Sequence, residues 1–257
     1  MALLHAAITG NPSEAPPLVL LHGFGGGGYA WEAVSASLGD RPLVVYDLPG
    51  HGRSIEAEGI GGAGRMAKAI AADLDRRGIT SCHVCGHSLG GAVAAILALR
   101  QPDRLKSLAL LSPGGFGPSI NHAALSRYAF PQDREDLRAA LREMMADTAE
   151  PSDRLIDRIY ADRLHADARD ALRQVFDGMM RPSMDGGLEQ GTLALAEFAG
   201  LGLPIHVLWG TGDRILPVPD AAALPAGMTL HLAEGAGHML VDECPEIVVD
   251  LLRGVCG

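Results

Sequence analysis

The residues best suited to chemistry lie at positions 86–90, where the sequence GHSLG matches the pattern G-x-S-x-G. A serine flanked by glycines is common in turns, so the pattern alone is weak evidence. Here an apolar strand is expected before it and an apolar helix after it, which is the context of a nucleophilic serine. The glycines let strand and helix approach closely while the serine adopts a strained backbone. We therefore predict that Ser88 attacks a carbonyl carbon from the carboxyl edge of a sheet.

A serine hydroxyl is a weak nucleophile at neutral pH, so it needs a general base, and the base needs an acceptor that orients it. After a serine in this strand–turn–helix context, the acid and then the histidine follow along the chain. Asp213 comes directly after the apolar run 205–209, and His238 lies in the glycine-rich segment 235–239. We predict that His238 is the base and Asp213 its orienting acid. As an alternative, Asp213 is a turn aspartate that satisfies only its own loop.

An oxyanion that forms during acyl transfer needs hydrogen-bond donors. The residue after the nucleophile and the loop after the first buried strand supply them in this context, which points to the backbone N–H groups of Leu89 and Phe24. The alternative for the Phe24 loop is a glycine-rich turn without a catalytic role. Three side chains adjoin these positions and are expected to line the substrate pocket: His22, His87 and Met239.

Positioning these residues requires a scaffold that brings distant segments to one edge. Short apolar runs suit strands that are buried on both faces. We expect such strands at 18–21, 43–46, 82–85, 105–111, 205–209 and 228–232. Helical spacing between several of them predicts an α/β fold, with a mostly parallel central sheet and helices on both faces.

The rhythm of strand and helix changes between residues 116 and 201. Apolar residues at three- and four-residue intervals predict helices at 134–147 and 153–180, and no convincing strand is evident. We interpret 116–201 as a helical cap inserted into a core formed by 1–115 and 202–257. Some of its side chains could form an apolar pocket, although core packing is the alternative: Met144, Met145, Phe176, Met179, Met180 and Phe198. Three arginines could meet a substrate carboxylate or simply water: Arg127, Arg158 and Arg181.

Composition limits the classes of function. The 257 residues are 47% hydrophobic and 20% charged, which suits one sizeable core. With 31 acidic and 21 basic side chains, the net charge is −10, and without a basic cluster we expect no nucleic-acid or membrane partner. The first ten residues lack the features of a signal peptide, and no apolar run approaches a membrane span. We expect a cytoplasmic enzyme that acts on a small-molecule acyl substrate.

Metal or redox chemistry has little support in the sequence. Cys82 and Cys85 form a C-x-x-C pair, but their odd spacing on an expected strand points the side chains to opposite faces. No H-E-x-x-H motif is present. We therefore expect neither a metal nor a cofactor.

Together these motifs resemble the α/β-hydrolase superfamily. The HGF loop at 22–24, DLPGHGRS at 47–54, the serine motif, GTGDR at 210–214 and the histidine at 238 follow the family's order over nearly the whole chain. The chain is most similar to the hydrolase-like module of acetoin dehydrogenase acyltransferase components, through 47–54, 111–121, 209–217 and 235–239. Lactonases and meta-cleavage-product hydrolases come next, although the latter typically carry Asn and Trp where this chain has His87 and Met239.

The resemblance implies a serine hydrolase that cleaves a small ester, thioester or lactone through an acyl-enzyme formed on Ser88. Two alternatives stay open. An acyltransferase would pass the acyl group to a thiol or alcohol instead of water. A ligand-binding or signalling protein of the same fold would keep the triad and turn over slowly.

Overall fold

The computed structural model describes residues 4–184 and 186–256. A seven-stranded sheet forms its centre, in the order β1-β3-β2-β4-β5-β8-β9. The first strand, β1, pairs antiparallel with β3, and every other neighbouring pair is parallel. These strands span Ala6–Thr9 (β1), Leu18–Leu21 (β2), Leu43–Tyr46 (β3), Cys82–His87 (β4), Leu105–Leu111 (β5), Ile205–Gly210 (β8) and Met228–Ala233 (β9). The predicted α/β fold with a mostly parallel sheet is confirmed.

Helices cover both faces of the sheet because the apolar side chains of each strand alternate. In β2, Val19 and Leu21 belong to one apolar cluster, whereas Leu18 and Leu20 belong to another. The first cluster contains α2 (Ala63–Arg76) and α3 (Leu89–Arg100); the second contains α1 (Glu32–Ser37), α8 (Leu240–Glu243) and α9 (Pro245–Cys256). Cys82 lies in the first cluster and Cys85 in the second, so the pair faces opposite sides as expected.

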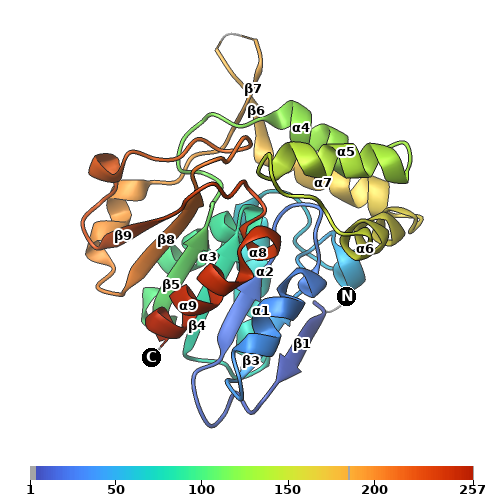
Figure 1. Cartoon of the computed structure of the whole chain (residues 1–257). Helices are drawn as coiled ribbons and strands as arrows, with labels where there is room; N and C mark the ends of the chain where they lie inside the picture. The colour runs from blue at the N-terminus through green and yellow to red at the C-terminus, as the bar shows by residue number, and fades with distance from the viewer. Residues whose placement is uncertain (1–3, 185, 257) are drawn as a thin grey trace.

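Four further helices lie between β5 and β8 in the chain, and Figure 1 shows them gathered on one side of the molecule, above the sheet. They are α4 (His122–Ala129), α5 (Arg134–Met144), α6 (Asp153–Arg163) and α7 (Ala168–Met179). Short 3-10 helices complete the fold: η1 (Gly28–Trp31), η2 (Gly52–Ser54), η3 (Pro102–Arg104), η4 (Leu195–Gly200) and η5 (Ala221–Ala223). Within the described ranges, no helix has the length and apolar character needed to cross a membrane.

The segment 116–201 differs from the sequence prediction in two respects. The expected helix at 153–180 is two helices, and a hairpin of β6 (Met180–Pro182) and β7 (Leu188–Gln190) follows where no strand was expected. Three-residue strands are too short to show an alternating pattern, so the turn residues of the sequence at 185–187, Asp-Gly-Gly, were not recognised as part of a hairpin. The division into a core and an inserted cap stays a prediction, and residues 1–3, 185 and 257 of it lie outside the described residues.

Strand β4 and helix α3 cross with backbone against backbone. A Cβ atom built on Gly86 would lie 2.1 Å from the carbonyl oxygen of Gly90, and one built on Gly90 would lie 2.3 Å from that of Leu21. Neither oxygen can move without displacing a strand or a helix. The two glycines therefore set how closely the helix approaches the sheet.

We expect Gly90→Ala to lower the free energy of unfolding by about 3 kcal/mol, because the added methyl group overlaps a backbone carbonyl of the central sheet. The matched control is Gly254→Ala in α9, where a Cβ meets open space. That change should raise the free energy of unfolding by about 0.5–1 kcal/mol, since alanine is the better helix former. Urea unfolding measures both. Equal effects of the two substitutions would contradict the tight crossing.

Candidate active site

Ser88 occupies the turn between β4 and α3 in a backbone conformation that L-residues rarely adopt. Its φ is 52° and its ψ is −114°, so the turn stores strain on the order of 1–3 kcal/mol. Its backbone N–H donates to Leu111 O at 2.9 Å, and its carbonyl accepts from the N–H of Gly114 at 3.0 Å. These bonds tie the turn to the end of β5 and hold the hydroxyl in place.

His238 lies in the loop between β9 and α8 and reaches Ser88 across 150 positions of sequence. Its Nε2 is 3.0 Å from Ser88 Oγ, and its Nδ1 is 2.8 Å from Asp213 Oδ2. With Nδ1 donating to the carboxylate, Nε2 is left to accept the serine proton. The imidazole is 1% exposed, which keeps water from competing for either nitrogen.

Asp213 follows β8, and its side chain is fully buried. Its Oδ1 accepts from the backbone N–H groups of Ile215 (2.8 Å) and Leu216 (2.9 Å), while Oδ2 faces His238. The carboxylate thus bonds both to its own loop and to the histidine, so it is not a turn aspartate that serves its own loop alone. Burial alone would raise the pKa of Asp213, but His238 and the backbone donors outweigh it and hold that pKa below its ordinary value.

The His238 loop is fixed by two residues whose role the sequence did not reveal. The Nε2–H of His87 donates to the carbonyl oxygen of His238 at 2.8 Å. Glu243 accepts hydrogen bonds from the backbone N–H groups of Gly237 and Met239, both at 2.9 Å, and from that of Ala146 at 2.8 Å. An isolated glutamate five positions after a histidine belongs to no motif, so nothing in the sequence marked it.

The three side chains predicted to line the substrate pocket are placed elsewhere. His87 supports the His238 loop, and burial together with the nearby His238 ring lowers the pKa of His87 to about 3, so this imidazole is neutral. His22 is fully buried, donating from Nδ1 to Gly23 O (2.7 Å) and accepting at Nε2 from the N–H of Leu48 (2.9 Å). Met239 is 8% exposed and packs in the core. None of these three buried side chains is among the described residues that line the cavity at Ser88.

Of the two predicted oxyanion donors, Leu89 directly follows Ser88, and Phe24 directly follows Gly23, on which a Cβ would lie 3.4 Å from Ser88 Cβ. Leu89 is the first residue of α3, so its N–H has no partner within the helix. Phe24 belongs to a loop whose next two N–H groups are used, since Gly25 donates to His51 Nε2 at 3.0 Å and Gly26 to Gly23 O at 3.1 Å. In the part of the chain that the structure describes, the N–H groups of Phe24 and Leu89 make no hydrogen bond. Both are therefore available to an oxyanion.

Ser88 opens into a cavity of about 180 Å³. Its walls come from α3, the end of α7, the β6–β7 hairpin and the loops after β5 and before α2. They are lined by Gly62, Ala63, Gly64, Leu89, Ala92, Ile96, Gly114, Gly115, Ile120, Gly178, Met179, Arg181, Gln190, Gly191, Thr192, Leu193 and Leu216. Of the methionines and phenylalanines considered for a pocket, only Met179 is among these described lining residues. The walls are mostly apolar or glycine backbone, which suits a small acyl group.

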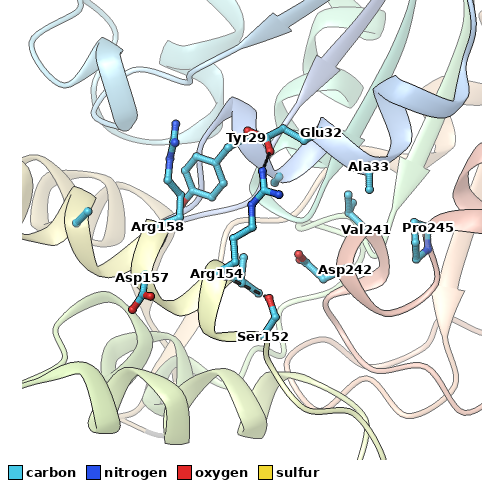
Figure 2. A pocket seen from close by; sticks show the side chains of 13 residues that line it. Tyr29, Glu32, Ala33, Ser152, Arg154, Asp157, Arg158, Val241, Asp242 and Pro245 are labelled. Atoms are coloured by element: carbon cyan, nitrogen blue, oxygen red, sulfur yellow. Dashed lines mark hydrogen bonds and ion pairs between the residues drawn. The ribbon is translucent and has the colours of Figure 1, made fainter.

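A larger cavity of about 960 Å³ lies away from the triad, between η1 and α1 on one side and α6 and the start of α9 on the other (Figure 2). Arg154 reaches across it to Glu32 at 2.5 Å, and Arg158 lies over the ring of Tyr29 at 4.9 Å. Asp242 also borders it, and burial, with Glu243 nearby, raises the pKa of Asp242 to about 7. A substrate site chosen by volume alone would be this cavity, but its described lining residues include neither Ser88 nor His238.

The described residues contain no cluster of three or more histidine, cysteine, aspartate or glutamate side chains arranged to hold a metal ion. The four cysteines are free thiols. What the site offers is a serine, an imidazole, an ionised carboxylate and two free N–H groups. That combination supports proton transfer and acyl transfer.

Comparisons with known proteins identify relatives of this chain. The acetoin cleaving system acetyltransferase components of Cupriavidus necator and Pseudomonas putida are 34% and 33% identical to this chain over 88% and 90% of its length. The chain spans 59% and 61% of those two relatives. A pimeloyl-[acyl-carrier protein] methyl ester esterase of Aeromonas salmonicida is 31% identical, with coverage of 95% of this chain and 96% of the esterase.

Solved structures show the same fold at lower identity. A 2-hydroxy-6-oxo-6-phenylhexa-2,4-dienoate hydrolase from Rhodococcus superposes with a TM-score of 0.79 at 20% identity, over 98% of this chain and 94% of the other. A carboxylesterase from Bacillus subtilis gives 0.79 at 20%, over 99% and 92%. The model of the alpha/beta hydrolase family matches residues 18–251. This chain belongs to the alpha/beta hydrolase family.

Proposed function

We propose that this protein is a serine hydrolase that cleaves a small carboxylic ester, thioester or lactone through an acyl-enzyme. One observation carries the proposal: a buried series of hydrogen bonds runs from Asp213 through His238 to Ser88, with distances of 2.8 and 3.0 Å. Its last member has a strained backbone, and the predicted oxyanion donors, the N–H groups of Leu89 and Phe24, make no hydrogen bond among the described residues. A structural serine in a turn needs none of these partners.

The geometry supports a reaction in two halves. Ser88 Oγ attacks the carbonyl carbon as its proton passes to His238 Nε2, and the N–H groups of Leu89 and Phe24 stabilise the oxyanion. The tetrahedral adduct collapses, the C–O or C–S bond breaks, and the imidazolium protonates the leaving group. Water, deprotonated by His238, then attacks the acyl-enzyme and releases the acid and free Ser88. Asp213 stays ionised and stabilises the imidazolium in both halves.

Relatives favour hydrolysis and acyl transfer alike. The esterase of Aeromonas salmonicida supports ester cleavage, whereas the two acetoin-system relatives carry the name of an acetyltransferase. Both reactions share the acyl-enzyme and differ only in what attacks it. Transfer to a thiol or alcohol is therefore the second candidate, and slow turnover of a bound ligand is a third outcome that a multiple-turnover assay would reveal.

Ser88→Ala should lower kcat/KM for 4-nitrophenyl acetate by about 10⁴-fold or more, because the nucleophile is lost while the N–H donors remain. The variant should also lose covalent labelling by a fluorophosphonate. Ser112→Ala is the matched control: this serine, just after β5, is buried and its hydroxyl has no partner. It should keep labelling and activity. Turnover retained by Ser88→Ala would remove the proposal.

On the acid side of the optimum, the pH dependence of kcat/KM should reflect the protonation of a single group. The pKa of Asp213 is held below its ordinary value and that of His87 is about 3, so both groups keep their charge state above pH 4. Only protonation of the general base then stops the reaction on the acid side of the optimum. Log kcat/KM should fall with a slope of 1 per pH unit. A slope of 2 would show that a second group of the site titrates together with the base.

Hydrolysis and acyl transfer can be separated by the fate of the acyl-enzyme. With 4-nitrophenyl acetate as donor and a millimolar thiol as competing acceptor, a hydrolase should release acetate at a rate that the thiol leaves unchanged. We expect this result because the cavity at Ser88 is small and suits the acyl group alone. Thioester formed at the expense of acetate, measured by mass spectrometry, would favour the acyltransferase.

A further inference from the structure

The cavity beside Ser88 contains one charged side chain among its described lining residues, Arg181 in β6. Its guanidinium lies against the backbone of Gly191, which also lines the cavity. A Cβ built on Gly191 would be 2.9 Å from Nη2 and 3.3 Å from Nε of Arg181. Because residue 191 is a glycine, there is room for the guanidinium in the cavity wall.

Arg181 is also the one arginine of its segment without a partner among the described residues. The other nine arginines between 116 and 201 each contact a carboxylate, a backbone carbonyl or an aromatic ring: Arg127, Arg134, Arg138, Arg142, Arg154, Arg158, Arg163, Arg169 and Arg173. Glu189 faces Arg181 across the hairpin, yet no ion pair between them is found among the described residues. The guanidinium thus keeps all its donors for a ligand.

Apart from Ser88, the other polar side chains among the described lining residues offer no charge to bind an anion. The Gln190 amide is occupied, since Oε1 accepts from the N–H of Gly115 at 3.0 Å and Nε2 donates to Gly117 O at 2.9 Å. Thr192 is uncharged. A planar guanidinium at the wall of an otherwise apolar space is suited to a carboxylate, which it can bind through two parallel hydrogen bonds.

The volume limits what lies between the carboxylate and the reacting carbonyl. A cavity of about 150 Å³ lined by apolar side chains holds benzene, so 180 Å³ suits about six to eight non-hydrogen atoms. We place the acyl portion of the substrate in this cavity. It stays attached to Ser88 through both halves of the reaction, whereas the leaving group departs after the first.

We propose that Arg181 determines specificity by binding a carboxylate at the far end of a short acyl chain, so that the preferred substrates are monoesters or monothioesters of dicarboxylic acids. This inference rests on the proposed serine-hydrolase function. It assigns Arg181 a part in binding and none in bond breaking.

The test compares two series of esters at pH 7.5: monoethyl glutarate and monoethyl adipate against ethyl pentanoate and ethyl hexanoate. The wild-type enzyme should prefer the anionic series in kcat/KM, measured from the ethanol released. Arg181→Gln should lower the ratio of anionic to neutral kcat/KM by about 10- to 100-fold, the range for a hydrogen bond between charged groups. Arg181→Lys should fall between the two, because lysine keeps the charge but not the paired donors.

The matched control is Arg154→Gln, which removes an exposed arginine that borders the larger cavity and pairs with Glu32. It changes the net charge equally and should leave the ratio as in the wild type. A ratio that Arg181→Gln does not change overturns the inference. So does an anion preference that appears only when the carboxylate is in the leaving group, tested with the acetate ester of 3-hydroxypropanoate against propyl acetate.

Failure of this inference is distinguishable from failure of the proposed function. If fluorophosphonate labels Ser88 and ethyl hexanoate is hydrolysed without any anion preference, only the role of Arg181 is wrong. If neither labelling nor hydrolysis occurs in a folded protein, both proposals are wrong. Thermal unfolding of Arg181→Gln checks the fold, and an unchanged Tm is expected since the side chain is exposed.

Discussion

The hydrogen bond between Ser88 and His238 joins two loops that only the sheet brings together. Ser88 follows β4, His238 follows β9, and between these strands lie β5 and β8. Because the four strands are parallel, their carboxyl ends meet at one edge, and the loops that follow them lie in reach of one another. Each loop must also be fixed locally to keep the two side chains within hydrogen-bonding distance. Backbone bonds to β5 fix the first; His87 and Glu243 fix the second.

The parts of this structure that the sequence predicted share one property: each carries its signal in a short stretch of neighbouring residues. The strand at 105–111 is an uninterrupted apolar run, and Ser88 lies in a five-residue pattern between two apolar elements. His238 and Asp213 needed only their order and their glycine-rich surroundings. The parallel sheet then followed from the alternation of such stretches, without knowledge of any contact between them.

The parts that were missed depend on contacts between distant residues. His87 and His22 were predicted to line the pocket because they adjoin the site in sequence. Both imidazoles are buried, and a buried imidazole needs hydrogen-bond partners, which the backbone supplies here. Glu243 binds two backbone N–H groups of the histidine loop and that of Ala146, and a carboxylate that binds backbone donors can stand at many positions. The β6–β7 hairpin, which carries Arg181, has strands too short for any periodicity.

The charges of the lining side chains indicate which of the two cavities binds the substrate more clearly than the volumes do. In the larger one, Arg154 pairs with Glu32, and Arg158 lies over the ring of Tyr29. Burial raises the pKa of Asp242 to about 7, so this carboxyl group is only partly ionised at neutral pH. Such a space has little unbalanced charge with which to select a ligand. The smaller cavity has the opposite character, because its apolar walls leave one guanidinium uncompensated beside the strained nucleophile. Among the described side chains that line the smaller cavity, Arg181 alone carries a charge, and an anionic substrate would supply the acidic partner that it does not have there.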